Sequence, residues 1–255
     1  MFLKTRLIFL SFFVAILSMD AIITAIRQDL QDSTDPGTLA SFQRFFKEAV
    51  HGYGVKVPVV NRIAQKYWKE VNSRNKKEIF GICEELYASH FIEEAFIVSN
   101  WVPRMKNQFE PEDFAVFEYW VGTYITNWAT CDSFCNHAVG DFIEKYPVFI
   151  EDLKRWAQSE NRWVRRAAAV SLIVPAKHGK FLKNVIEISD LLLIDKDDMV
   201  QKGYGWLLKE ASRKNQTVVY DFVVRNRKKM PRTALRYAIE LMPRDLKTEA
   251  MKKDW

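Results

Sequence analysis

The chain has 255 residues, a net charge of +6 and a hydrophobic content of 48%. This composition supports a folded protein with a sizeable core and argues against a disordered chain. Its 9 glycines and 8 prolines leave little material for the many tight turns of an all-β protein, and its 3 cysteines are too few for a disulfide framework.

Residues 1–18 form a hydrophobic leader, which we set apart from the folded domain. Lys4 and Arg6 precede an apolar run that has the length of a signal-peptide core and is too short for a confident membrane span. No cleavage site with small residues follows it, and Met19 directly precedes an ordinary helix start. We therefore interpret Met19 as the start of the mature protein and expect a cytoplasmic, nucleoid-associated location without membrane contact. A genuine signal or anchor, with export or membrane attachment, is the alternative.

From Met19 onward, apolar residues recur with helical spacing in segments separated by short polar breaks. The clearest segments are 36–50, 58–71, 111–125, 161–174, 197–213 and 231–242. Asn127 and Asn161 stand where helix N-caps are expected, and Pro231 fits a first helical turn. No run of alternating polarity is long enough for a strand, so the sequence predicts an all-α fold.

The helices repeat with a period of about 35 residues, which is typical of stacked helix pairs. Equivalent basic positions lie 36 and 34 residues apart, at Arg166, Lys202 and Arg236. Moving 36 residues towards the N-terminus from Val164 gives Trp128 and then Ile92, and both begin helical runs.

Stacked pairs share one continuous core. We therefore predict a curved solenoid of HEAT/ARM-like helical repeats, an α-α superhelix, as a single domain over residues 19–247. A tail over residues 248–255 follows, and we expect a monomer.

Positive charge is concentrated in the C-terminal part of the chain. Residues 1–153 hold 15 Lys and Arg against 20 Asp and Glu, whereas residues 154–255 hold 23 against 12. Such an excess is expected of a protein that binds phosphate, although a solvated lysine-rich surface or an acidic membrane partner would also account for it. The repeat places Arg166, Lys202 and Arg236 at equivalent positions of successive repeats. A row of cations there would suit the phosphate backbone of a duplex. Ordinary helix-start charges that face solvent are the alternative.

One segment could carry chemistry. Trp128 and Asp132 are four residues apart and share a helix face. Trp206 stands beside Gly205 and close to Gly203 inside a helical run, where glycine costs about 1 kcal/mol relative to alanine. We infer that another group packs closely against the helix backbone at these glycines. Core packing for the tryptophans and surface exposure for Asp132 are the alternatives.

Cys131, Cys135 and His137 could ligate a metal, but the sequence offers no second ligand cluster. We interpret the two cysteines as small buried thiols and expect neither metal nor cofactor.

Four short motifs carry a resemblance to a known family. They are the turn Gly54–Pro58, the pair Trp128 and Asp132, the segment Trp163–Ala167, and the segment Gly205–Glu210. Together with the repeat, over about residues 20–245, they resemble the AlkD-type alkylpurine DNA glycosylases. The sequence departs from the best-known pattern of that family at Ala129, where an acidic residue is usual, and at Cys131, where an aliphatic one is usual.

The resemblance implies hydrolysis of the N-glycosidic bond of cationic N3- or N7-alkylated purines in double-stranded DNA. Asp132 would stabilise an oxocarbenium-like transition state and orient the attacking water. The indoles of Trp128 and Trp206 would hold the cationic nucleotide, with about 0.5–2 kcal/mol each.

The resemblance also implies that Arg166 grips a phosphate. The other DNA-binding candidates are Arg165, Lys202, Arg236 and Phe45, with Phe46 as the alternative to Phe45. A non-catalytic DNA-binding relative and a protein-interaction scaffold are the competing functions.

Overall fold

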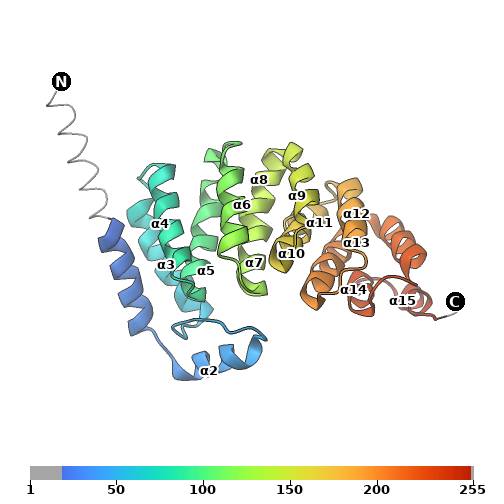
Figure 1. The fold of residues 1–255 in the computed structure, drawn as a ribbon, viewed down its shortest axis with the longest axis horizontal. Helices are drawn as coiled ribbons and strands as arrows, with labels where there is room; N and C mark the ends of the chain where they lie inside the picture. Colours follow the sequence, from blue (N-terminus) through green and yellow to red (C-terminus); the bar gives the residue numbers. More distant parts are fainter. Residues whose placement is uncertain (1–18, 254–255) are drawn as a thin grey trace. The chain divides into compact units, whose positions relative to one another are not determined.

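The computed structural model describes residues 19–253, apart from the side chain of Gln43. Over this range the chain folds into α-helices with short 3-10 and π segments (Figure 1), and its β-type pairing is an isolated bridge between His51 and Phe91. The predicted all-α class is confirmed. The predicted leader, residues 1–18, lies outside the described residues. None of the helices described is long and apolar enough to cross a bilayer.

Backbone contacts divide the chain into an N-terminal unit, which ends at Gln108, and a C-terminal unit, which begins at Phe109. The N-terminal unit contains a helix over residues 19–32, α2 (Pro36–Phe45), α3 (Val57–Val71), α4 (Lys76–Ala88), α5 (Ile92–Trp101) and the 3-10 segment η1 (Val102–Gln108). Helix α5 packs against α3 and α4, and the indole nitrogen of its buried Trp101 donates to the carbonyl of Ala64 at 2.7 Å.

Two adjacent, fully buried glutamates hold this unit together. The carboxylate of Glu93 accepts hydrogen bonds from the backbone N–H groups of Tyr53, Gly54 and Val55 at 2.8–3.0 Å. Glu94 accepts from the guanidinium of Arg27 at 3.1 Å and from the Tyr53 hydroxyl at 2.6 Å. A buried charge needs such partners, because burial removes its hydration. The two glutamates therefore fix the loop between α2 and α3 onto α5.

The C-terminal unit contains the longer run of helices. They are α6 (Asp113–Thr123), α7 (Trp128–Phe134), the π segment η2 (Cys135–Val139), α8 (Gly140–Lys145), the 3-10 segment η3 (Pro147–Phe149), α9 (Ile150–Trp156), α10 (Arg162–Val170), α11 (Ile173–Lys177), α12 (Leu182–Leu191), α13 (Asp198–Asn226), α14 (Arg232–Ala238) and α15 (Arg244–Ala250).

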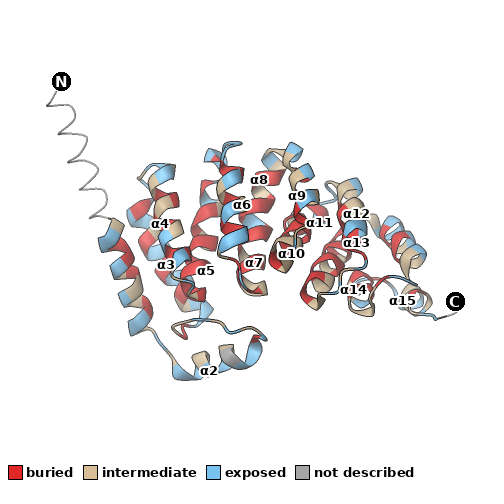
Figure 2. Ribbon diagram, viewed as in Figure 1, coloured by how far each residue is buried: buried red, intermediate tan, exposed pale blue. Residues whose placement is uncertain are grey.

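The helix starts show the repeat and correct one step of it, because Arg162, and not Val164, is the counterpart of Trp128. Helices α7, α10, α13 and α14 start at residues 128, 162, 198 and 232, and each packs against the next. Figure 2 shows buried residues along the helices of this unit, and on α10 they include the run Ala167–Val170. Because short alanine side chains let neighbouring backbones approach, α10 can pack between α7 and α13. The stack of helical repeats is thus confirmed for these helices.

Several predicted boundaries shift. The segment predicted over 36–50 ends its helix at Phe45. The segment predicted over 197–213 continues to Asn226, across a break at Asn215, whose φ of −135° and ψ of 49° are not helical. Helix α15 extends past residue 247 to the buried Ala250, so the segment predicted as a tail contains the last turn of a helix.

The two glycines of α13 allow close packing. A β-carbon at Gly205 would lie 2.7 Å from Cβ of Tyr237 and 2.8 Å from the carbonyl oxygen of Ala234, both on α14. A β-carbon at Gly203 would lie 3.2 Å from Cγ of Arg166. The close approach expected at these glycines is therefore made by the protein's own α10 and α14.

We expect Glu93→Gln to lower the free energy of unfolding by about 2 kcal/mol or more, because the amide presents N–H groups to backbone donors that lose a charged acceptor. Denaturant-induced unfolding followed by circular dichroism measures the change. The control is Glu112→Gln at an exposed position, which should change stability by less than about 0.5 kcal/mol. Equal effects of the two substitutions would contradict the assigned role of Glu93.

We expect Gly205→Ala to lower the free energy of unfolding by about 1–3 kcal/mol, because the new methyl group meets the α14 backbone and overpacks the helix contact. A β-carbon at Gly122, in α6, would meet no atom of the described residues within 4 Å beyond its own helix turn. Gly122→Ala should therefore stabilise the protein by about 0.5–1 kcal/mol through helix propensity. Thermal or chemical denaturation of both variants tests whether Gly205→Ala lowers, and Gly122→Ala raises, the free energy of unfolding.

Candidate functional site

Helix α7 places an indole and a carboxylate side by side. Its N-cap is Asn127, whose side chain accepts from the backbone N–H of Thr130 at 3.0 Å. Trp128 and Asp132 follow at positions four apart, so they share one face of α7, and both are half-buried. The cap thus sets where the helix begins, and with it where Asp132 points.

Asp132 forms a two-pronged ion pair with Arg166 of the neighbouring helix α10. Nε and Nη2 of Arg166 donate to the two carboxylate oxygens at 2.8 Å each. The side chains of Asp132 and Arg166 keep 16% and 6% of their exposure, respectively. Nη1 of Arg166 donates in addition to the backbone carbonyl of Met199 at the start of α13. Charge-assisted pairs of this parallel type fix orientation as well as adding stability, so Asp132 is held in one direction.

The two charges act on each other's protonation. Burial raises the pKa of Asp132 above its ordinary value, and the hydrogen bonds and charge of Arg166 oppose that rise. Burial works to lower the pKa of Arg166, but Asp132 raises it above its usual range. Arg166 therefore stays charged, and Asp132 loses its charge at a higher pH than an exposed aspartate does.

Trp206 lies half-buried on α13, three residues after the glycine that accommodates Arg166. Trp128 and Asp132 on α7, Arg166 on α10 and Trp206 on α13 thus come from equivalent helices of three successive repeats. All four residues lie in the C-terminal unit.

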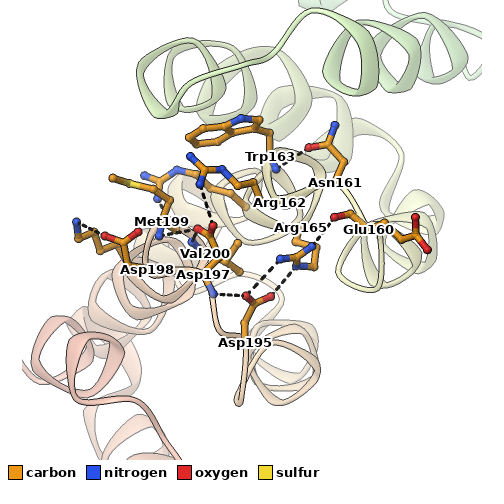
Figure 3. A network of polar contacts seen from close by, with 12 residues as sticks. Glu160, Asn161, Arg162, Trp163, Arg165, Asp195, Asp197, Asp198, Met199 and Val200 are labelled. Atoms are coloured by element: carbon orange, nitrogen blue, oxygen red, sulfur yellow. Dashed lines mark hydrogen bonds and ion pairs between the residues drawn. The ribbon is translucent and has the colours of Figure 1, made fainter. Parts of the chain in front are cut away.

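Arg165 is engaged in contacts between repeats (Figure 3). Its guanidinium donates to Asp195 at 2.6 Å and to the backbone carbonyls of Ser159 and Glu160 at 2.9 Å. Most of its donors therefore already have protein partners.

The neighbouring Arg162 donates to Asp197 at 3.0 Å and lies 4.4 Å from the ring centre of Trp163. Asp197 also caps the first turn of α13. The contact between Arg162 and Asp197 therefore joins the start of α10 to the start of α13.

The basic positions of the repeat differ in their surroundings. Arg166 is buried, Lys202 is half-buried and pairs with Asp198 at 3.3 Å, and Arg236 is exposed. The three equivalent positions therefore differ in exposure, and their joint contact with a duplex backbone stays a prediction. Arg166 pairs with Asp132 of the preceding repeat, whereas Lys202 pairs with Asp198 of its own helix.

Phe45 lies at the end of α2 in the N-terminal unit and is 67% exposed, whereas Phe46 is buried. Their rings meet edge to face with centres 5.8 Å apart. Of the two candidate aromatics, Phe45 is thus the one that solvent can reach.

The cysteines of α7 and η2 lie inside the core. Cys131 and Cys135 are free thiols and fully buried, and Sγ of Cys131 lies 3.8 Å from the carbonyl oxygen of Trp163. Burial raises the pKa of Cys131 well above its ordinary value, which disfavours the thiolate that binds metals. Among the described residues, no three His, Cys, Asp or Glu side chains gather as a metal site would require.

Asp195, Asp197 and the carbonyl of Met199 are partners of the arginines that are not among the residues predicted from the sequence. Asp197 is the N-cap of α13, and an aspartate just before an apolar helical run is a usable signal for such a cap. A backbone carbonyl leaves no such signal, because any residue carries one.

Comparisons with known proteins identify the family and a similar fold. The family model described as DNA alkylation repair enzyme matches residues 26–242. A predicted DNA alkylation repair enzyme from Enterococcus faecalis has a similar structure, with a TM-score of 0.73 and 17% identity, over 83% of this chain and 98% of that one.

The alkylpurine DNA glycosylase AlkC of Pseudomonas fluorescens, solved bound to DNA containing an abasic site analog, has a TM-score of 0.48 and 15% identity, over 89% of this chain and 61% of that one. A comparison with curated proteins finds no match. Because the family model covers most of its length, this chain belongs to the family of DNA alkylation repair enzymes.

Proposed function

We propose that this protein is a DNA glycosylase that hydrolyses the N-glycosidic bond of cationic N3- or N7-alkylated purines in double-stranded DNA. The observation that carries the proposal is the ion pair of Asp132 with Arg166, next to the half-buried Trp128. Membership of the DNA alkylation repair family supports the same class of substrate.

The chemistry needs one carboxylate. An alkylated purine already carries positive charge, so it leaves as a neutral base with the electron pair of the broken C1′–N bond. Positive charge then builds on the deoxyribose, as in glycoside hydrolysis. Asp132 stabilises that charge and takes a proton from the water that adds to C1′. Each of its oxygens keeps a lone pair for this purpose while Arg166 occupies the other.

Arg166 acts through Asp132 in this proposal. Its side chain is 6% exposed and is already bonded to Asp132 and to Met199, so we propose that it orients the carboxylate and keeps it ionised. A phosphate contact, expected from the sequence, would have to use the donors that remain.

For DNA contacts we propose Arg236, Lys202 and the exposed ring of Phe45. Arg165 is a weaker candidate, because Asp195 holds it. Trp128 and Trp206 would contact the cationic nucleotide through their ring faces. We further propose that the protein acts as a monomer in the cytoplasm.

Purified protein should release 7-methylguanine or 3-methyladenine from alkylated duplex DNA. Asp132→Asn should reduce the single-turnover rate by about 100-fold or more, because one preorganised charge is lost from the transition state. The control is Asp190→Asn, at an exposed position of α12, which should keep the wild-type rate. A wild-type protein that binds duplex DNA but frees no methylated purine would leave a non-catalytic DNA-binding function instead.

The rate should also have an acid limb set by Asp132. Its raised pKa means that the carboxylate is protonated, and activity lost, at a higher pH than the usual value of about 3.9 predicts. Arg166→Met removes the opposing cation, so the limb should move to still higher pH, whereas Arg166→Lys should move it less. Single-turnover rates against pH, corrected for spontaneous depurination, measure the shift. A limb that stays in place in Arg166→Met would remove Arg166 from this role.

A further inference from the structure

Tyr237 of α14 begins directly on the backbone of α13. The two helices pack against each other, and their contact is closest at Gly205. A β-carbon there would lie 2.7 Å from Cβ of Tyr237 and 3.1 Å from Cα of Ala234. Gly205 directly precedes Trp206, one of the two candidate site tryptophans. The packing of α14 therefore fixes where the Tyr237 side chain starts.

The phenol of Tyr237 lies near Arg166. Burial works to lower the pKa of Arg166, Asp132 raises it above its usual range, and Cys131 and Tyr237 add to the rise through their charges. Arg166 itself rests on α13 at Gly203, where a β-carbon would lie 3.2 Å from its Cγ and 3.6 Å from its Nη1. Gly203 and Gly205 are two residues apart, so α10 and α14 both meet one short stretch of α13. Tyr237 thus brings a fourth helix to the neighbourhood of the ion pair.

The hydroxyl of Tyr237 is open to a ligand. The residue is half-buried, its hydroxyl is not enclosed, and no hydrogen bond among the described residues uses it. The hydroxyls of Tyr53, Tyr146 and Tyr204 show the usual case, because each donates to an oxygen of the protein. Tyr237 therefore keeps its donor for a partner outside the chain.

The charges near Tyr237 favour an anion as that partner. Arg236, the preceding residue, is exposed, and Lys202 of α13 stands at the equivalent position one repeat earlier. The negative charge of Asp132 is already balanced by Arg166. A phenol donates a hydrogen bond without carrying charge. Phosphate and sugar oxygens receive most of the hydrogen bonds that proteins make to DNA, those from tyrosine included.

We propose that the hydroxyl of Tyr237 donates a hydrogen bond to one backbone phosphate of the strand that carries the lesion, an inference that rests on the glycosylase function proposed above. Arg166 spends three of its N–H donors on Asp132 and Met199, so Tyr237 supplies the neighbouring donor that is still free. The strand is the damaged one because Asp132, the partner of Arg166, must face C1′ of the lesion. Tyr237 is therefore a binding residue that positions this strand, and it takes no part in the chemical step.

The first test is Tyr237→Phe, which keeps the ring on Gly205 and removes only the hydroxyl. The Kd for a short duplex with one tetrahydrofuran abasic-site analogue should rise by about 3- to 10-fold. Its salt dependence should stay the same, because no charge is lost. Arg236→Gln should instead reduce the slope of log Kd against log salt concentration by about 1.

The matched control is Tyr220→Phe. Tyr220 is likewise half-buried, and no hydrogen bond among the described residues uses its hydroxyl, but it lies in α13 beyond the break at Asn215. This variant should keep the wild-type Kd. Equal losses of affinity in Tyr220→Phe and Tyr237→Phe would contradict a specific contact at Tyr237.

Replacing one phosphate at a time by a neutral methylphosphonate gives a readout that a structural residue would not change. At the contacted phosphate the replacement should weaken binding by the wild-type protein more than binding by Tyr237→Phe, which already lacks the hydrogen bond. At the other phosphates the two proteins should lose affinity equally. A difference confined to one position of the damaged strand would identify the contact.

The outcomes separate this contact from the function on which it rests. Identical methylphosphonate profiles for wild type and Tyr237→Phe would overturn the contact and leave the glycosylase function standing. A wild-type protein that binds the duplex but frees no methylated purine would overturn the glycosylase function, and the profiles would still decide the contact. A wild-type protein without affinity for the duplex would overturn both.

Discussion

Arg166 reaches Asp132 because α7 and α10 begin 34 residues apart and lie side by side in the stack. The two residues stand at equivalent positions of successive repeats, so their opposite charges meet across the helix interface. Neither charge could be buried alone at low cost, since an unpaired ion in the interior loses its hydration. The carboxylate is consequently held in one orientation by the protein itself, which is the preorganisation that the proposed electrostatic catalysis would require.

That pair in turn depends on the helix that follows. Gly203 leaves space for the Arg166 side chain, and the carbonyl of Met199 takes one of its remaining donors. Gly205, two residues further along, lets α14 approach the same helix. The orientation of Asp132 is therefore fixed by contacts that run from α7 through α10 to α13, and helix packing and site geometry rest on the same residues.

The sequence was sufficient for features that are encoded locally. The N-caps at Asn127 and Asn161, the helix starts at Trp128 and Ile92, and the repeat length all follow from short-range patterns, and the structure agrees with them. Short-range patterns do not predict which of the repeated cations stays exposed. Arg166 and Arg236 are equivalent in the repeat, yet one is buried against an acid and the other is exposed, because the outcome depends on the residue that the neighbouring repeat supplies.

The ion pair also bears on which bases the proposed enzyme could release. A neutral purine is a poor leaving group unless an acid protonates it, and in the proposed scheme Asp132 acts as a carboxylate, which has no proton to give. A cationic alkylated purine needs no such acid, and its charge is the property that the faces of Trp128 and Trp206 would attract. Selectivity for damaged bases would then follow from the charge of the lesion rather than from a pocket shaped to one base. In this scheme the arginine that fixes the catalytic carboxylate also limits the chemistry to substrates that are already activated.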